Sequence, residues 1–207
     1  MLCKDIDILK LEPGLFMGAY FPFASQTLSR GVDGSLSGTT LTVTGQNFTS
    51  QSVSAGHVVY LSDGVGNIDG VFEIVSVDSA TQLTLSVVRS EETQTPISIG
   101  ISSGLFYRVS TLAPQLVQAE YEISQTLRLK PGCPDSRYGL DNLTDQKTLK
   151  SACTYWSLAL IFGSMYGMYS IGESPTDCWD AYQNKLTNYM QRAENSLQHL
   201  TLSFTGI

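Results

Sequence analysis

The sequence predicts an α+β protein in which a small antiparallel β-barrel or sandwich follows an N-terminal arm and precedes a three-helix bundle. Residues 30–110 are rich in Gly, Ser, Thr and Val and contain short runs of alternating apolar residues, a pattern typical of strands. After residue 111 the apolar period changes from two to about 3.6, the period of amphipathic helices. With 207 residues, the chain is long enough to bury a substantial core.

These changes of pattern divide the chain into four parts. We expect an N-terminal extended arm, a β module, a three-helix domain and a C-terminal extended tail, at residues 1–29, 30–110, 111–200 and 201–207. The arm contains LEPGLFMGAYFPFASQTL (11–28), which is apolar but has no period of its own. Such a segment needs a partner surface, so we expect it to pack on the helices or on a neighbouring copy, with Leu15 and Phe16 as interface residues.

The β module is predicted from six runs separated by turn signals at 62–70 and 77–82. The runs are TTLTVTG (39–45), HVVYLS (57–62), GVFEIVSV (70–77), TQLTLSVV (81–88), PISIGI (96–101) and LFYRV (105–109).

Three helices are predicted after the β module. The first lies in 111–129 with Pro114 in its first turn, and the second begins near Asn142 as its cap. The third begins at Ser174 as cap, with Pro175 at the first helical position. Its buried stripe would consist of Trp179, Tyr182, Leu186, Tyr189, Ala193, Leu197 and Leu200, leaving Asp180, Lys185 and Glu194 outside.

The second helix runs through SACTYWSLALIFGSMYGMYSIG (151–172), 22 positions without Asp, Glu, Lys or Arg. This length would suffice for a membrane span, but eight of the 22 residues are Ser, Thr or Gly. Gly163 and Gly167 form a G-x-x-x-G pair, which also occurs at close contacts in soluble bundles. We therefore expect no membrane span but a central helix covered by protein, with Ala159, Gly163 and Gly167 at contacts between copies.

Composition excludes several functions. The formal net charge is -7, so tight nucleic-acid binding through a basic surface is not expected. Only 15% of residues are charged, which suggests that much of the surface meets protein. The four cysteines have no metal-ligand spacing and are expected as reduced thiols. Because Asp5, Asp7 and Glu12 interrupt the N-terminus, no secretion signal is expected.

Catalytic and metal-binding patterns are weak. His57 and His199 stand alone, so no acid–base constellation is visible. The loop at 62–70 has Asp63, Asn67 and Asp69, but Ile74 stands where a calcium loop of the EF-hand type needs Glu, and a hairpin turn is the better interpretation. Glu91 and Glu92 form an adjacent acidic pair, either solvated or facing a channel. No enzyme activity, cofactor or metal is expected.

Several segments carry a resemblance to a known family. The arm segment 11–28 with the β module 37–89, followed by APQLVQAEYEI (113–123), LKSACTYWSLALIF (149–162) and WDAYQNKLTNYMQRAENSL (179–197), resembles head-to-tail adaptor (connector) proteins of tailed bacteriophages.

The resemblance implies a structural virion protein without an active site, made in the host cytoplasm and placed in the neck between capsid and tail. Such proteins form a ring of about twelve copies beneath the portal protein, extend the DNA channel without sequence-specific binding, and dock the next neck or tail protein. On this view Glu91 and Glu92 would face the channel. The docking residues in the tail would be Leu200, Leu202, Phe204 and Ile207, adding a strand to the portal or a neighbour.

A decoration or fibre-base module that recognises a surface glycan or another virion protein is the alternative. It predicts an exposed aromatic platform, for which Tyr60, Phe72 and Tyr107 are the candidates. Alternation along the strand places Phe72 with Ile74, which favours the core instead.

Overall fold

The structure, a computed structural model, describes residues 2–170, 176–200 and 203, with backbone only at 169–170 and 176–179. The protein is α+β, with a six-stranded antiparallel barrel and α-helices. The chain forms two compact units, one of residues 4–112 and one of residues 113–207 together with the first three residues.

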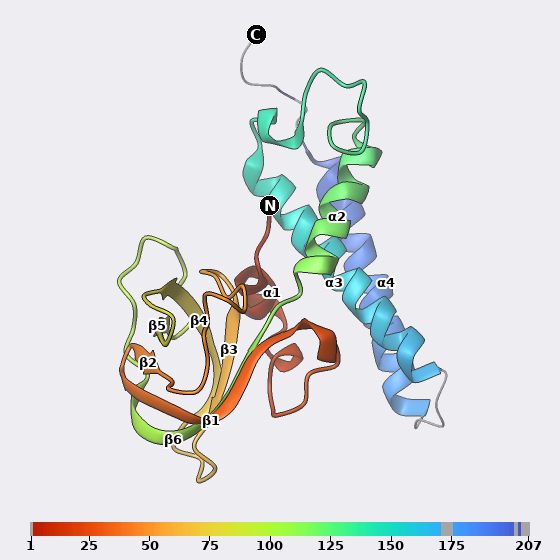
Figure 1. Cartoon of the computed structure of the whole chain (residues 1–207). Coiled ribbons are helices and arrows are strands. Elements are labelled where there is room, and N and C mark those ends of the chain that lie inside the picture. Colours follow the sequence, from red (N-terminus) through yellow and green to blue (C-terminus); the bar gives the residue numbers. More distant parts are fainter. Residues whose placement is uncertain (1, 171–175, 201–202, 204–207) are drawn as a thin grey trace. The chain divides into compact units, whose positions relative to one another are not determined.

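The first unit is a closed barrel with strand order β1-β2-β5-β4-β3-β6 (Figure 1). Every neighbouring pair is antiparallel, and closure leaves no strand edge unpaired. The strands are β1 (Thr27–Gly38), β2 (Thr40–Thr42), β3 (Val58–Ser62), β4 (Asp69–Val77), β5 (Gln82–Ser86) and β6 (Gly100–Ser110).

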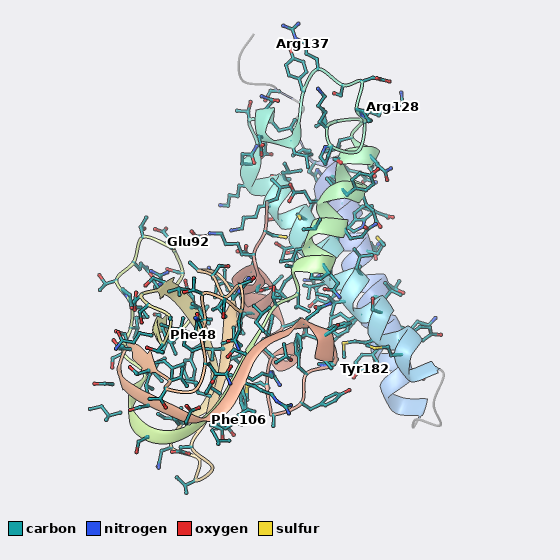
Figure 2. The ribbon with its side chains drawn as sticks, in the orientation of Figure 1. Phe48, Glu92, Phe106, Arg128, Arg137 and Tyr182 are labelled. Atoms are coloured by element: carbon teal, nitrogen blue, oxygen red, sulfur yellow. The ribbon has the colours of Figure 1, made fainter. Side chains whose placement is uncertain are left out.

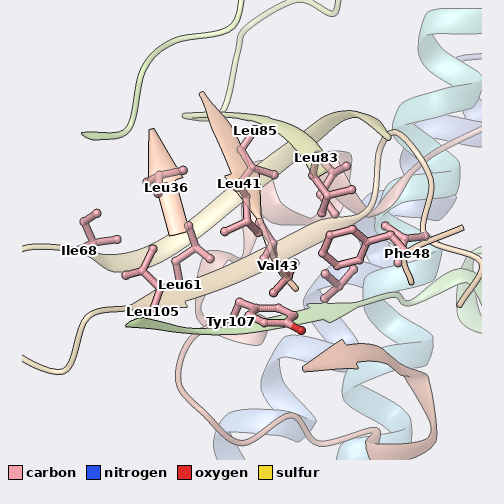
Figure 3. Close-up of a cluster of buried hydrophobic side chains, with 14 residues drawn as sticks. Leu36, Leu41, Val43, Phe48, Leu61, Ile68, Leu83, Leu85, Leu105 and Tyr107 are labelled. Atoms are coloured by element: carbon pink, nitrogen blue, oxygen red, sulfur yellow. The ribbon is translucent and has the colours of Figure 1, made fainter. Parts of the chain in front are cut away.

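The barrel is filled by inward-facing apolar side chains of all six strands and the 43–53 segment (Figure 3). The core residues are Leu36, Leu41, Val43, Phe48, Val53, Val59, Leu61, Ile68, Ile74, Leu83, Leu85, Leu105, Tyr107 and Val109. Phe48 packs edge-on against the ring of Tyr107, with centroids 6.2 Å apart. Alternation of apolar residues along β4 and β5 is what directs Ile74, Leu83 and Leu85 to this interior.

The strand predictions are wrong in two places. PISIGI is not a separate strand, because Gly100–Ser110 forms one continuous β6 that includes LFYRV. Strand β1 was not expected, because Gly and Ser occupy much of Thr27–Gly38 and give little apolar alternation. Its pairing with β6 is irregular between Gly31 and Ser35, as in a β-bulge.

Most of the segment predicted as an extended arm, from Lys4 on, belongs to the barrel unit. It contains helix α1 (Asp5–Leu11) and two 3-10 turns, η1 (Pro13–Leu15) and η2 (Ala24–Gln26). The carboxylate of Asp7 accepts a hydrogen bond from the backbone N–H of Lys4 (2.9 Å), which satisfies one free donor at the start of α1. The end of the arm is hydrogen-bonded to the residue that follows β6, because the N–H of Thr111 donates to the carbonyl of Gln26 (3.1 Å).

The second unit contains three long helices, as predicted. They are α2 (Ala113–Thr126), α3 (Gln146–Ser170) and α4 (Thr176–Gln198), with a short turn η3 (Leu140–Asn142) before α3. Helices α3 and α4 lie side by side (Figure 1), and Phe162 of α3 stacks on Tyr182 and Tyr189 of α4. Within the described part of the chain, none of the helices combines the length and the hydropathy that a membrane span requires.

The start of α3 differs from the prediction. Asn142 lies in η3 and accepts a hydrogen bond from the N–H of Gly139, whereas Asp145 accepts one from the N–H of Thr148 (3.1 Å). Asp145 therefore acts as the cap. Ala193 on α4 and Leu200, which follows α4, are buried, and Leu186, Tyr189 and Leu197 are half-buried, so these residues of the predicted stripe face the unit interior. Lys185, predicted to lie outside, is half-buried as well, with its Nζ 4.8 Å from the centroid of the Phe162 ring. Ser174 and Pro175 lie outside the described residues.

Candidate functional surfaces

Two small residues proposed for contacts between copies lie instead within one chain. The side chain of Ala159 is fully buried, so it has no surface to offer a neighbour. Gly163 faces α4, because a Cβ built on it would lie 3.6 Å from Leu186 Cδ1. That distance is an ordinary van der Waals contact, so Gly163 lies against α4 of its own chain, and the predicted contact between copies is corrected at the buried Ala159.

Another face of α3 remains open. Leu160 and Gly167 are half-buried, and Ser164 and Met168 are exposed, Met168 by 45%. These four residues, here called the α3 stripe, follow one another at i, i+4, i+7 and i+8 and so lie on one side of the helix. No charged residue occurs on α3 after Lys150. The α3 stripe is therefore a half-exposed helix face that carries no charged side chain.

Helix α2 also exposes apolar side chains. Val117 and Tyr121 are four residues apart and are 56% and 41% exposed, so they adjoin on the helix surface. The other side of α2 is buried through Leu116, Ala119 and Ile123.

The two arm residues proposed for contacts between copies are buried. Phe16 has no exposed side-chain area and stacks on Phe21, with centroids 6.0 Å apart. Leu15 is 8% exposed. The backbone of the arm is held by Arg108, whose guanidinium donates to the carbonyls of Phe16 and Gly18 (both 2.6 Å). The prediction that Phe16 contacts a neighbour is therefore wrong, because its own chain already covers it.

The same arginine lines a cavity of about 540 Å³ within the barrel unit. Its walls come from the arm, from β1, from the 46–51 segment and from β6. The lining residues are Ala19, Tyr20, Phe21, Ala24, Thr27, Leu28, Ser29, Arg30, Gln46, Gln51 and Arg108. Sequence reasoning did not find this cavity, because its two arginines are far apart in the chain and only the pairing of β1 with β6 brings them together.

The acidic pair lies in the long connection between β5 and β6 (Figure 2). Glu91 is exposed, and the carboxylate of Glu92 forms an exposed ion pair with Lys4 Nζ at 2.9 Å. Arg89 holds this connection in place, because its guanidinium donates hydrogen bonds to the backbone carbonyls of Glu92 (2.8 Å) and Gln94 (2.5 Å). Arg89 is also paired with Glu73 at 2.6 Å, and both side chains are buried.

The predicted docking residues of the tail fall largely outside the described part of the chain. Leu200 is described and is buried, with 8% exposed, while Leu202, Phe204 and Ile207 lie outside the described residues. Ser203 is described, and its carbonyl accepts hydrogen bonds from the N–H and the hydroxyl of Thr144, both at 2.9 Å. At this point the tail is bound to the segment that precedes α3.

The loop between β3 and β4 is a turn closed by its own carboxylate. Asp63 accepts hydrogen bonds from the N–H groups of Val65, Gly66 and Ile68 at 2.8–3.2 Å. Desolvation by itself would raise the pKa of Asp63, but these backbone hydrogen bonds together outweigh it and lower the pKa. Among the described residues, no group of three or more His, Cys, Asp or Glu side chains is placed to hold a metal ion.

His57 is engaged with its own turn. Its Nδ1 accepts from the N–H of Ser54, and its Nε2 lies 3.2 Å from Ser54 Oγ. Burial lowers the pKa of His57. Both ring nitrogens thus contact one residue, and no carboxylate in the described part of the chain orients the ring as a catalytic triad would require.

The three aromatic residues considered for glycan binding do not form an exposed platform. Tyr107 is fully buried in the barrel core. Tyr60 is 7% exposed and donates its hydroxyl to Asp69 at 2.6 Å, and Phe72 is partly buried against the core. Their role in the core is confirmed.

The barrel and helical units together define an α+β chain without a recognisable catalytic constellation among its described residues. A comparison with known protein families, curated proteins and solved structures finds no match to this chain.

Proposed function

We propose that the protein is a structural virion protein, a head-to-tail adaptor that forms a ring under the portal, extends the DNA channel and docks the next neck or tail component. The resemblance of its segments to such adaptors suggests this function. The observation that carries it in the structure is the α3 stripe, because a half-exposed helix face without charge is suited to burial against another copy.

Charge supports the same proposal. The net charge of -7 gives the protein no general affinity for the DNA backbone, which suits a channel through which DNA slides. In a ring of about twelve copies, each protomer would offer the α3 stripe to one neighbour and a different surface to the other, as a heterologous contact requires.

The α3 stripe is tested by placing a charge on it. Ser164→Lys puts an ammonium group in the proposed interface, where an unpaired charge is costly to bury. We expect this variant to fold as the wild type does but to lose ring formation on portal-bearing heads. The matched control is Ser151→Lys, because Ser151 is also exposed on α3 and lies on the side of the helix opposite Leu160.

The measurement is the mass of the protein with and without a portal ring, together with circular dichroism for folding. A ring that Ser164→Lys leaves intact would contradict the proposal, as would equal loss in both variants. Ala159→Lys is unsuitable here, because a lysine at that fully buried position would unfold the monomer.

The tail is tested by a short truncation. Deleting residues 204–207 removes Phe204 and Ile207 but keeps Ser203, whose carbonyl bonds to Thr144. We expect a folded monomer that no longer docks on portal-bearing heads. Unchanged docking by this truncated protein would remove the tail from the docking surface and leave the α3 stripe to be judged separately.

A further inference from the structure

Two arginines face each other across neighbouring strands of the barrel. In the pairing of β1 with β6, Arg30 lies directly opposite Arg108. Like charges at directly opposed positions destabilise a sheet. Both arginines also line the 540 Å³ cavity, so two positive charges lie at one open cavity.

Other cations of this unit are engaged. Residues 4–112 contain five basic and ten acidic residues. Lys4 and Arg89 are paired with Glu92 and Glu73, and Lys10 donates to the carbonyl of Ser90. Among the described residues, neither Arg30 nor Arg108 is within ion-pair distance of a carboxylate. In an acidic unit, this leaves a local excess of positive charge at the cavity.

Arg108 is itself incompletely satisfied. Its side chain is 1% exposed, its terminal nitrogens donate to two carbonyls of the arm, and its guanidinium lies 5.1 Å from the centroid of the Phe21 ring. Its Nε makes no hydrogen bond. Burial of this cation lowers its pKa, the direction expected when charge is desolvated without a counter-ion. An anion in the cavity would supply the missing counter-charge.

The cavity also contains an acceptor. Gln51 Oε1 is buried without a hydrogen-bond partner, while Gln51 Nε2 donates to Gln46 Oε1 (2.5 Å). A free acceptor beside two cations suits a ligand that carries both a negative charge and an N–H group. Tyr20, Phe21 and Leu28 supply apolar walls, and the volume lies in the range of pockets that bind small groups.

We propose that this cavity receives a carboxylate of a partner protein, either an acidic side chain or a chain end, with the backbone N–H beside it bonded to Gln51. Guanidinium groups bind carboxylates through charge-assisted, often bidentate hydrogen bonds. A phosphate of DNA fits less well, because the apolar walls and the acidic net charge oppose an extended polyanion. This proposal does not depend on the adaptor function.

The test is a titration of the full-length protein followed by NMR at the side-chain Nε–H of Arg108 and the backbone amide of Gln51. The probes are acetyl-Gly-Glu-Gly-amide, its neutral counterpart acetyl-Gly-Gln-Gly-amide, acetyl-Gly-Gly-Gly with a free carboxyl end, and inorganic phosphate. We expect saturable shifts with one or both carboxylate peptides, and which of the two binds more tightly identifies the source.

A pair of variants makes the test specific. Arg30→Gln should weaken carboxylate binding about tenfold, the effect of losing one charge-assisted contact. Because the side chain of Arg30 is exposed and makes no hydrogen bond to the described residues, this variant should fold normally. Lys10→Gln removes the same charge from an exposed position of the same unit and should leave binding unchanged.

Four outcomes would overturn the proposal. These are the absence of any shift at Arg108, equal shifts with the neutral peptide, equal affinity in wild type and Arg30→Gln, and tighter binding of phosphate than of either carboxylate peptide. The last would make the cavity a phosphate site.

Discussion

The carboxylate of Asp5 accepts a hydrogen bond of 2.7 Å from the backbone N–H of Leu112, which joins the first helix to the residue that follows the last strand of the barrel. Asp5 is 2% exposed. Burial raises its pKa to about 6, although the bonds from Leu112 and Thr111 oppose the rise. The contact therefore holds the arm to the barrel but leaves a charge buried at neutral pH.

Stability should depend on pH through Asp5. Its folded pKa of about 6 lies above the unfolded value of 3.8, so its contribution is full below about pH 3.8 and is lost as the pH rises through 6. A shift of this size corresponds to roughly 3 kcal/mol. We expect the wild type to lose up to this amount relative to Asp5→Asn between pH 4 and 7, measured by urea unfolding. Glu91→Gln, at an exposed carboxylate, is the control, and parallel curves for wild type and Asp5→Asn would contradict the prediction.

Removing the cation of the buried pair of Glu73 and Arg89 should lower the free energy of unfolding far more than removing the cation of the exposed pair of Lys4 and Glu92. Arg89→Met leaves the carboxylate of Glu73 buried without its counter-ion, and we expect a loss of about 3–5 kcal/mol in the free energy of unfolding. Adding Glu73→Gln to this variant should recover part of the loss. Lys4→Met breaks the exposed pair and should cost at most about 1 kcal/mol. Denaturant unfolding of the four proteins checks this, and similar losses from Arg89→Met and Lys4→Met would refute it.

Replacement by alanine at two glycines of the helical unit should change the free energy of unfolding in opposite directions. A Cβ at Gly132 would overlap the backbone nitrogen of Gln125 and approach Ser124 Oγ to 2.6 Å, so Gly132→Ala should cost about 1–3 kcal/mol or more. At Gly167 none of the described atoms lies within 4 Å of the added Cβ, and Gly167→Ala should stabilise the monomer by roughly 0.5–1 kcal/mol. Thermal unfolding of both variants separates these effects, and a neutral result at Gly132 would show that the 124–132 loop repacks freely.

The thiols of Cys3 and Cys153 should resist modification in the folded protein. They lie 3.1 Å apart and are not joined by a disulfide, and both are fully buried. The hydrogen bond with Cys3 and burial raise the pKa of Cys153, which suppresses the reactive thiolate. In a Cys178→Ser background we expect one fast reaction with a thiol reagent, at the half-buried Cys133, and two that await unfolding. Fast labelling of Cys3 would show that the N-terminus leaves α3.

Much of the architecture follows from local pattern. The alternation in HVVYLS and GVFEIVSV specifies β3 and β4, and the stripe through Leu186, Tyr189 and Ala193 specifies α4. Local pattern did not predict β1, because its many Gly and Ser residues leave little alternation of apolar side chains. It also failed for Phe16 and Ala159, since an apolar or small residue looks the same whether its own chain or a neighbour covers it.

The sequence by itself determined the fold class and the order of the barrel before the three long helices, because these depend on the periodicity of nearby residues. It did not determine that the charge-free helix α3, expected to be covered by protein, keeps exposed side chains at Ser164 and Met168. Only the tertiary structure decided which strands pair and in which register. Register places Arg30 opposite Arg108, 78 positions apart in the chain, and the packing of the arm on the barrel makes both of them line one cavity. Such arrangements depend on contacts between distant segments. The entropy lost in closing the chain between them and the energy gained from their pairing cannot be read from any short segment of sequence.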